Sequence, residues 1–200
     1  MKTGQNFNHP KPGSKISVEP IRELKDIRSI KRLLHDNPRD LALFVVGINT
    51  NLRASDLCEI TVGQVKDLKA GDELVLNERK TGKERRINLN KDCVNVIQKL
   101  TESLNSSRRD DSQLFRGRQG DIDTVGVNYL VKKWCKMINL KGRYGSHTLR
   151  KTFGYQMRVQ HKVSIPVLMT IFNHSTQKQT LDYLCVQPDE VKEVYMLGVG

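Results

Sequence analysis

His147-Thr148-Leu149-Arg150-Lys151-Thr152-Phe153 is the stretch of this sequence from which both a fold and a site can be predicted. In a helix, residues three positions apart share one face, so His147 and Arg150 are expected to address one ligand together. Leu149 and Phe153 are then expected to point toward the core. A His-x-x-Arg spacing alone is weak evidence, because such residues more often form ordinary surface charge.

The surroundings of this stretch are the most basic part of the chain. The 34 Lys and Arg residues outnumber the 22 Asp and Glu residues, and the formal net charge is +12. This excess favours a polyanionic partner, because each phosphate that a protein neutralises releases counterions. Ribosomal, membrane-surface and heparin-binding proteins can be equally basic, so charge alone does not single out nucleic acid. The cations near the stretch are Lys132, Lys133, Lys136, Lys141, Arg143 and Lys151.

Composition predicts one soluble, cytoplasmic domain. The 200 residues and the hydrophobic fraction of 37% are typical of a single globular unit. The longest apolar run, Leu41–Val46, is too short to cross a bilayer, and residues 1–20 contain no apolar stretch of the kind found in signal peptides. The cysteines are widely spaced, which indicates reduced core thiols in an intracellular protein. They are Cys58, Cys93, Cys135 and Cys185.

Periodicity predicts a mainly α-helical fold with a small antiparallel β-sheet, an α+β protein. Residues 1–20 are predicted to be a flexible leader, and residues 21–200 one domain. Strands are predicted over Glu73–Asn77 and Arg85–Leu89, around a turn at Thr81–Lys83, with a third short strand near Val65–Leu68. Helices are predicted over 23–37, 39–48, 55–60, 91–104, 124–137, 146–159, 164–172, 177–184 and 188–196, with a loop over 105–112.

Metal and nucleotide chemistry have no support in the sequence. It contains no His-Glu-x-x-His, no paired cysteine ligands and no glycine-rich phosphate loop. The tight carboxylate pairs, Asp110-Asp111 and Asp121 with Asp123, lie in predicted polar loops. A two-metal nuclease needs several converging carboxylates, so these pairs are better interpreted as solvated loop charge. We therefore expect no metal and no cofactor.

Three further polar positions are ambiguous when each is taken alone. Arg53, at a turn that opens a short helix, could simply pair with Asp56 on the surface. Lys80, beside the hairpin turn, could be an ordinary edge-protecting charge. Tyr183 lies nine residues beyond His174, and a tyrosine on an amphipathic helix is usually a packing anchor.

The order and spacing of these pieces together resemble the tyrosine recombinase (phage integrase) family. The matching segments are Leu52–Leu57, Lys80–Arg85, His147–Phe153, and His174-Ser175 through to Tyr183. The resemblance extends over about residues 22 to 195 and implies a mainly helical fold with a small sheet, in agreement with the periodicity.

The resemblance implies a DNA strand breakage and rejoining reaction with Tyr183 as the covalent nucleophile. Arg53 and Arg150 are suited to gripping the non-bridging oxygens of a phosphodiester, because arginines remain charged and donate paired hydrogen bonds. They are expected to stabilise the charge that develops in the transition state.

The resemblance implies three further roles around that phosphate. His147 would help to accept the tyrosine proton, Lys80 would protonate the leaving 5′-oxygen, and His174 would donate a hydrogen bond to the phosphate. From its position alone, Asp56 is expected to orient Arg53 or His147. Resealing would need no ATP, because the 3′-phosphotyrosyl linkage keeps the bond energy.

The sequence departs from the family pattern in three respects. Asn173 stands where a glycine often precedes the histidine, and Lys151 replaces the residue common after the arginine. Most relatives carry an N-terminal helical domain, whereas about twenty residues precede the predicted domain here. The chain thus resembles the short, catalytic-domain forms such as fimbrial switch recombinases, or a fragment of a longer protein.

The partners implied by the resemblance are double-stranded DNA, further copies of the chain in a tetramer on DNA, and accessory DNA-bending proteins. The resemblance also implies association with the nucleoid and no membrane partner. The segment 188–200 carries an apolar face, Val191, Val194, Tyr195 and Leu197, which would dock on a neighbouring subunit or on its own domain. The alternatives are a non-catalytic DNA-binding regulator, a related type IB topoisomerase and a basic RNA-binding protein.

Overall fold

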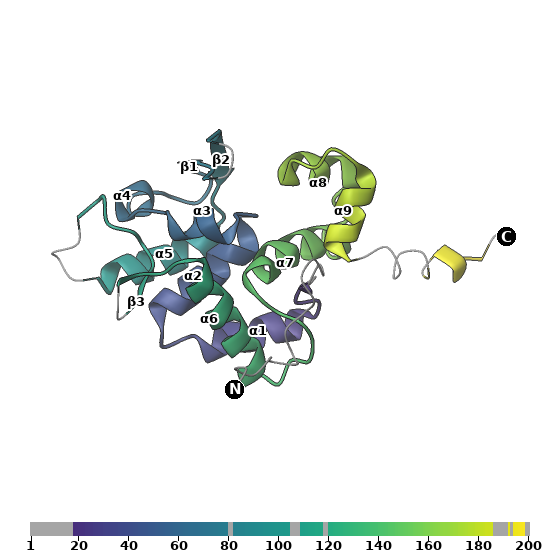
Figure 1. The fold of residues 1–200 in the computed structure, drawn as a ribbon, viewed down its shortest axis with the longest axis horizontal. Helices are drawn as coiled ribbons and strands as arrows, with labels where there is room; N and C mark the ends of the chain where they lie inside the picture. The colour runs from purple at the N-terminus through teal and green to yellow at the C-terminus, as the bar shows by residue number, and fades with distance from the viewer. Residues whose placement is uncertain are drawn as a thin grey trace, which may run out of the picture.

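The computed structural model describes residues 18–79, 82–104, 109–117, 120–185, 192 and 194–198. In this part of the chain the fold is mainly helical with two small antiparallel hairpins, which confirms the predicted fold class (Figure 1). The helices are α1 (Leu24–Leu33), α2 (Pro38–Asn49), α3 (Ala54–Cys58), α4 (Val62–Val65), α5 (Lys91–Glu102), α6 (Thr124–Met137), α7 (Ser146–Val159), α8 (Ile165–Phe172) and α9 (Gln177–Leu184). The strands are β1 (Glu73–Asn77), β2 (Glu84–Asn88), β3 (Arg116–Gly117) and β4 (Gly120–Asp121).

Helix α2 is the centre of the main hydrophobic core. It begins with Pro38 at its first position, and the side chain of Asn37 caps it by accepting a hydrogen bond from the Asp40 amide at 3.1 Å. Most of its length is buried, and it packs against α5 and α7. Trp134 of α6 meets Phe44 edge-on, with ring centroids 5.9 Å apart, and its Nε1 donates to Asp40 Oδ2 at 3.2 Å. A polar group of α2 is thereby satisfied inside the core.

The third strand predicted near Val65–Leu68 is wrong, because helix α4 covers the start of that stretch. The Thr61 side chain caps the helix, and Gln64 Oε1 accepts from the Thr61 amide at 2.9 Å. The hairpin of β1 and β2 therefore forms a two-stranded sheet, with Leu74 opposite Ile87. The short hairpin of β3 and β4 was not predicted from the sequence.

The segment just before α1 is held against α7. Ile21 is fully buried, and its amide donates to Thr152 Oγ1 at 2.8 Å. Gln156 Nε2 donates to the carbonyls of Ile21 and Arg22, at 3.0 and 2.7 Å. Of the predicted leader the structure describes residues 18–20, where the Glu19 amide donates to the Arg143 carbonyl at 2.7 Å.

Helices α8 and α9 stand to one side of the molecule and connect to the main body through α7 (Figure 1). They share a second, smaller apolar cluster with the end of α7. Gly154 allows their close approach: a Cβ at this position would lie 2.3 Å from Leu184 Cδ2 and 2.6 Å from Phe172 Cζ. Fully buried members of the cluster are Leu168, Phe172 and Leu184.

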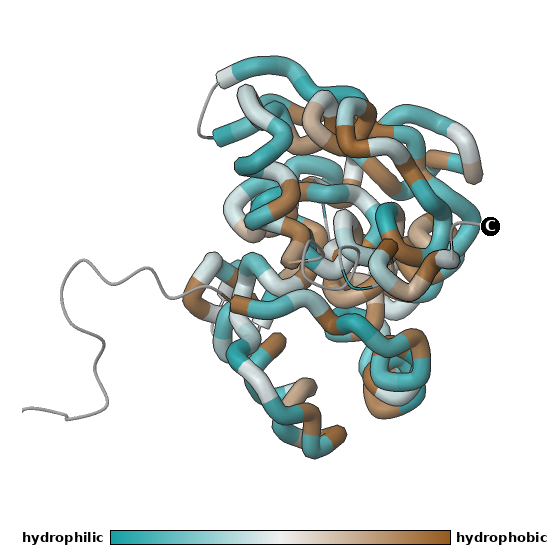
Figure 2. The backbone as a smooth tube through the Cα atoms, turned by 90° about the vertical axis from the view of Figure 1, so that its right-hand side faces the viewer, coloured by the Kyte–Doolittle hydropathy of each residue, from teal (hydrophilic) through white to brown (hydrophobic). Residues whose placement is uncertain are grey.

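Hydrophobic and hydrophilic residues alternate along most of the backbone, as expected for helices with one buried face (Figure 2). Among the described residues, no helix has the length and apolarity needed to cross a lipid bilayer. Most of the predicted helix over 188–196 lies outside the described residues. Of the apolar face predicted there, Val194, Tyr195 and Leu197 are described, and all three are exposed.

Candidate active site

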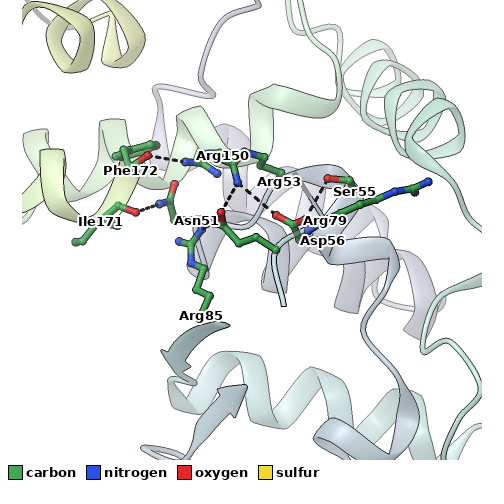
Figure 3. A network of polar contacts seen from close by, with 10 residues as sticks. Asn51, Arg53, Ser55, Asp56, Arg79, Arg85, Arg150, Ile171 and Phe172 are labelled. Carbon is green, nitrogen blue, oxygen red and sulfur yellow. Dashed lines mark hydrogen bonds and ion pairs between the residues drawn. The ribbon is translucent and has the colours of Figure 1, made fainter. Parts of the chain in front are cut away.

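Arg53 stands at the entry of α3 with an extended backbone, and its guanidinium faces two buried carboxylates. Its Nη1 lies 2.9 Å from Glu78 Oε2 and 3.8 Å from Asp56 Oδ2. Asp56 is 2% exposed, so a surface pairing of Arg53 with Asp56 is wrong. Asp56 Oδ1 also accepts the Arg79 amide at 3.1 Å (Figure 3). Arg53 is thus positioned from behind by a built polar network.

Arg150 lies inside α7 and is buried, with 5% exposure. Its Nη2 donates to the Phe172 carbonyl at 3.2 Å, and its guanidinium lies 5.1 Å from the centre of the Phe172 ring (Figure 3). The preceding carbonyl, that of Ile171, accepts from Asn51 Nδ2 at 2.8 Å. Two side chains from the main body therefore fix the end of α8.

The electrostatics of Arg150 suit the binding of an anion. Burial lowers the pKa of Arg150 to about 10, with a further lowering from the charge of Arg53, so the guanidinium remains charged at neutral pH. Its Nη1 is buried and has no hydrogen-bond partner among the described residues. A buried donor without a partner is costly, and an incoming phosphate oxygen would satisfy it.

The turn after α8 positions His174 beside Tyr183. Helix α8 ends at Asn173 in the left-handed conformation with φ 55°, which asparagine tolerates, so the glycine common in the family is not required here. The His174 ring stacks on Phe172 with centroids 5.3 Å apart, and its Nδ1 pairs with Thr180 Oγ1 at 3.0 Å. The Tyr183 ring meets His174 edge-on at 5.4 Å and Phe172 at 5.2 Å.

Tyr183 lies in the electrostatic field of both arginines. Burial raises the pKa of the phenol, while the charges of Arg150 and Arg53 lower it. Lys151, which departs from the family pattern, lies with its Nζ 5.0 Å from the centre of the Tyr183 ring. The phenol is thus held neutral in the free protein, beside cations that would stabilise its anion.

His147 is in the first turn of α7, at the rim of a cavity of about 940 Å³. Partial desolvation of the ring lowers the pKa of His147, and the charges of Arg150, Lys151 and Arg53 lower it further. An unprotonated imidazole can accept a proton. Four of the cations singled out in the sequence line the same cavity: Lys132, Lys136, Lys141 and Arg143.

Five members of the predicted site are described. His174 and Tyr183 are in ring contact, and the charges of Arg53 and Arg150 act on His147, His174 and Tyr183. The sixth, Lys80, lies outside the described residues. Within the described ranges, no group of three His, Cys, Asp or Glu side chains is arranged to hold a metal ion.

Glu78 was missed by the reasoning from sequence, where it is one charge among several around the hairpin turn. A signal was nonetheless present. Leu74 and Leu76 face inward from β1, and because side chains alternate along an extended strand, position 78 faces the same way. An inward-facing acid two residues before Lys80 should therefore have been a candidate.

The model of the phage integrase family matches residues 22–190. A probable integrase/recombinase of Bacillus subtilis, YoeC, is 33% identical over 186 residues, which cover 92% of this chain and 98% of that protein. The tyrosine recombinase XerC of Caldanaerobacter subterraneus is 32% identical over 198 residues, which cover 89% of this chain and 55% of that protein. The chain therefore spans about half the length of this XerC relative.

Solved structures share the fold. The crystal structure of XerA recombinase has a TM-score of 0.70 at 20% identity, covering 98% of this chain and 68% of that one. XerH site-specific recombinase, in a post-cleavage complex with palindromic difH substrate, has a TM-score of 0.67 at 14% identity, covering 92% of this chain and 55% of that one. Together with the family match over residues 22–190, the sequence relatives and the fold show that the chain belongs to the phage integrase family of site-specific tyrosine recombinases.

Proposed function

We propose that this chain cleaves and rejoins double-stranded DNA with Tyr183 as its nucleophile. The observation that supports this most strongly is the presence of the Tyr183 phenol within the field of Arg53 and Arg150, where Arg150 keeps a buried donor without a partner. Attack of the phenol oxygen on phosphorus forms a 3′-phosphotyrosyl bond and releases a 5′-hydroxyl. In the reverse step, an incoming 5′-hydroxyl displaces the phenol, so a strand is rejoined without an external energy source.

In this proposal the two arginines bind the non-bridging oxygens of the scissile phosphate. Negative charge grows on these oxygens in the pentacoordinate transition state, and preorganised donors in a partly buried site stabilise that charge most effectively. Arg150 is fixed by the Phe172 carbonyl, and Arg53 by Glu78 and Asp56. Since their supports already exist in the free protein, little reorganisation is needed when DNA binds.

Proton transfer is assigned to the remaining residues. The pKa of Tyr183 is raised by burial, so the phenol needs a base, and His147 is suited because its own pKa is lowered. His174 donates to the phosphate while Thr180 holds its other nitrogen. By the family pattern, Lys80 protonates the leaving 5′-oxygen. Lys80 directly follows Arg79 in the sequence.

The proposed DNA surface is the basic wall beside His147. The cavity there is lined by Lys132, Lys136, Lys141 and Arg143, and phosphate contacts of this kind position a duplex without reading its sequence. Structural neighbours include XerH bound to difH substrate and a lambda integrase dimer bound to a COC' core site. We extend DNA binding to this chain and propose that it forms a tetramer on DNA. In this proposal residues 21–200 form the catalytic domain, and segment 188–200 makes the contact between subunits.

The test uses a duplex nicked near the cleavage site, so that a short fragment diffuses away and the covalent intermediate accumulates. The duplex carries the ends of the chain's own mobile element or chromosomal site. Wild-type protein is expected to form an adduct that survives denaturant, and Tyr183→Phe to form none while still binding the duplex. An adduct with Tyr183→Phe would assign the nucleophile elsewhere. DNA binding by both proteins without any adduct would favour the non-catalytic regulator instead.

A further inference from the structure

We infer that Glu78 is a positioning residue for strand cleavage, which fastens the base of the β1–β2 hairpin to Arg53 and serves as the shared counterion of the arginine cluster. The inference rests on the proposed function, because the effect of Glu78 is exerted through Arg53 and the hairpin that carries Lys80. Glu78 itself does not contact the substrate.

The first support is a bridging contact. Glu78 is 8% exposed; its Oε2 lies 2.9 Å from Arg53 Nη1, and its Oε1 accepts from Arg85 Nη1 at 3.0 Å. Arg85 belongs to β2, and Arg53 precedes α3. The Glu78 carboxylate therefore joins strand β2 to the start of helix α3.

The second support is the direction in which the carboxylates lie. Side-chain exposure falls from 23% for Arg53 to 10% for Glu78 and 0% for Asp56. Arg53 Nη1, the atom that faces both carboxylates, is itself buried, so the exposed part of the Arg53 side chain lies away from them. Glu78 supports the guanidinium from behind and does not compete with a phosphate for its open edge.

The third support is the balance of charge. The charges of Arg53 and Arg85 both disfavour the charged form of Arg150 and so lower its pKa, whereas the charge of Glu78 raises it. Partly buried arginine side chains repel one another, and a buried anion among them offsets this repulsion. Glu78 contacts two of these three arginines directly, at 2.9 and 3.0 Å.

The fourth support is the attachment of the hairpin turn. The Glu78 amide donates to the Lys83 carbonyl at 2.9 Å, and the Gly82 amide donates to the Glu78 carbonyl at 2.7 Å. The next amide, of Arg79, donates to Asp56 Oδ1 at 3.1 Å. The two residues that precede Lys80 in the sequence are therefore both held by hydrogen bonds.

The experiment measures single-turnover adduct formation at saturating nicked duplex, together with the dissociation constant for the same duplex. Glu78→Gln keeps the shape of the side chain and removes its charge, and the cleavage rate is expected to fall by about 10-fold to 100-fold, because a displacement of about 1 Å is enough for such a loss. DNA affinity is expected to change by less than about threefold, since the open edge of Arg53 remains. The matched control is Glu84→Gln on the same hairpin, whose carboxylate is exposed and pairs with Arg86 at 2.9 Å; its cleavage rate should equal that of wild type.

A second arm separates positioning from simple loss of structure. Adding Arg85→Gln to Glu78→Gln removes one cation from the unbalanced cluster and is expected to restore the cleavage rate several-fold. If Glu78→Gln does not fold, Glu78→Asp takes its place: it keeps the charge but cannot reach both arginines, so slower cleavage with an unchanged melting temperature is expected.

Wild-type cleavage rates in the Glu78 variant that folds, or a double variant slower than Glu78→Gln, would overturn the inference. Failure of the wild-type protein to form any Tyr183 adduct would instead overturn the proposed function, so the two failures are distinguishable.

Discussion

Gly154→Ala is expected to slow DNA cleavage far more than it affects folding. Gly154 lies in α7 where α8 and α9 pack against it, and an added Cβ would lie 2.3 Å from Leu184 Cδ2 and 2.6 Å from Phe172 Cζ. Carbon atoms separate by at least about 3.5 Å at optimal contact, so the two neighbours must retreat by roughly 1 Å. Phe172 packs against the Tyr183 ring at 5.2 Å, and Leu184 is the next residue after Tyr183.

The stability change follows from two opposing effects. Overpacking of a filled core costs about 1–3 kcal/mol, while replacing glycine by alanine inside a helix gains about 0.8–1.0 kcal/mol. The net destabilisation is then about 0–2 kcal/mol, or a fall in melting temperature of at most about 8 °C for a domain of this size. A shift of about 1 Å at a reacting group can cost about 100-fold in rate.

The assay compares single-turnover adduct formation with thermal unfolding for wild type, Gly154→Ala and a control, Gly126→Ala. Gly126 is in the first turn of α6, where an added Cβ meets Ile122 Cγ2 at 3.1 Å, well away from the α8–α9 packing, so cleavage should stay at the wild-type rate. A Gly154→Ala protein that is folded and cleaves at the wild-type rate would refute the reasoning. An equal loss in both variants would show that the effect is not transmitted through α8 and α9.

Three further perturbations test other parts of the structure. Arg150→Ala should lower the cleavage rate by on the order of 10²–10³-fold, the typical effect of removing a transition-state donor, with DNA affinity much less affected; equal losses in gel-shift and adduct assays would make Arg150 a general DNA contact. Acidification from about pH 7.5 to 5.5 should lower the melting temperature, because the folded protein holds the pKa values of His147 and His174 below their unfolded value of 6.5. The unfolded state therefore takes up protons first, and the folded state becomes less stable as the pH is lowered. His147→Asn should flatten this pH dependence, and an unchanged slope would contradict the assignment. Trp134→Phe should cost about 1–3 kcal/mol in urea unfolding, because Asp40 loses a buried hydrogen bond; a smaller loss would mean that Asp40 is satisfied without it.

Local patterns predicted the helices well and the tertiary site less completely. Helices α6, α7 and α9 begin and end where periodicity placed them. The short helix α4 was not predicted, although Thr61 and Gln64 have the spacing of a capping box, and the strand predicted near Val65–Leu68 is not formed. Asn51 Nδ2 donates to the Ile171 carbonyl, a contact between segments far apart in sequence. No periodicity encodes such a contact. The burial of Asp56 is of the same kind, whereas that of Glu78 follows from the alternation of side chains along β1.

The apolar interior is divided unequally, since a large cluster fills the main body and a much smaller one supports α8 and α9. Regions with few buried contacts detach from a folded protein at a lower free energy than global unfolding requires. Backbone amides of α9 should consequently exchange with deuterium sooner than those of α2. The α8–α9 unit would then open while the main body stays folded.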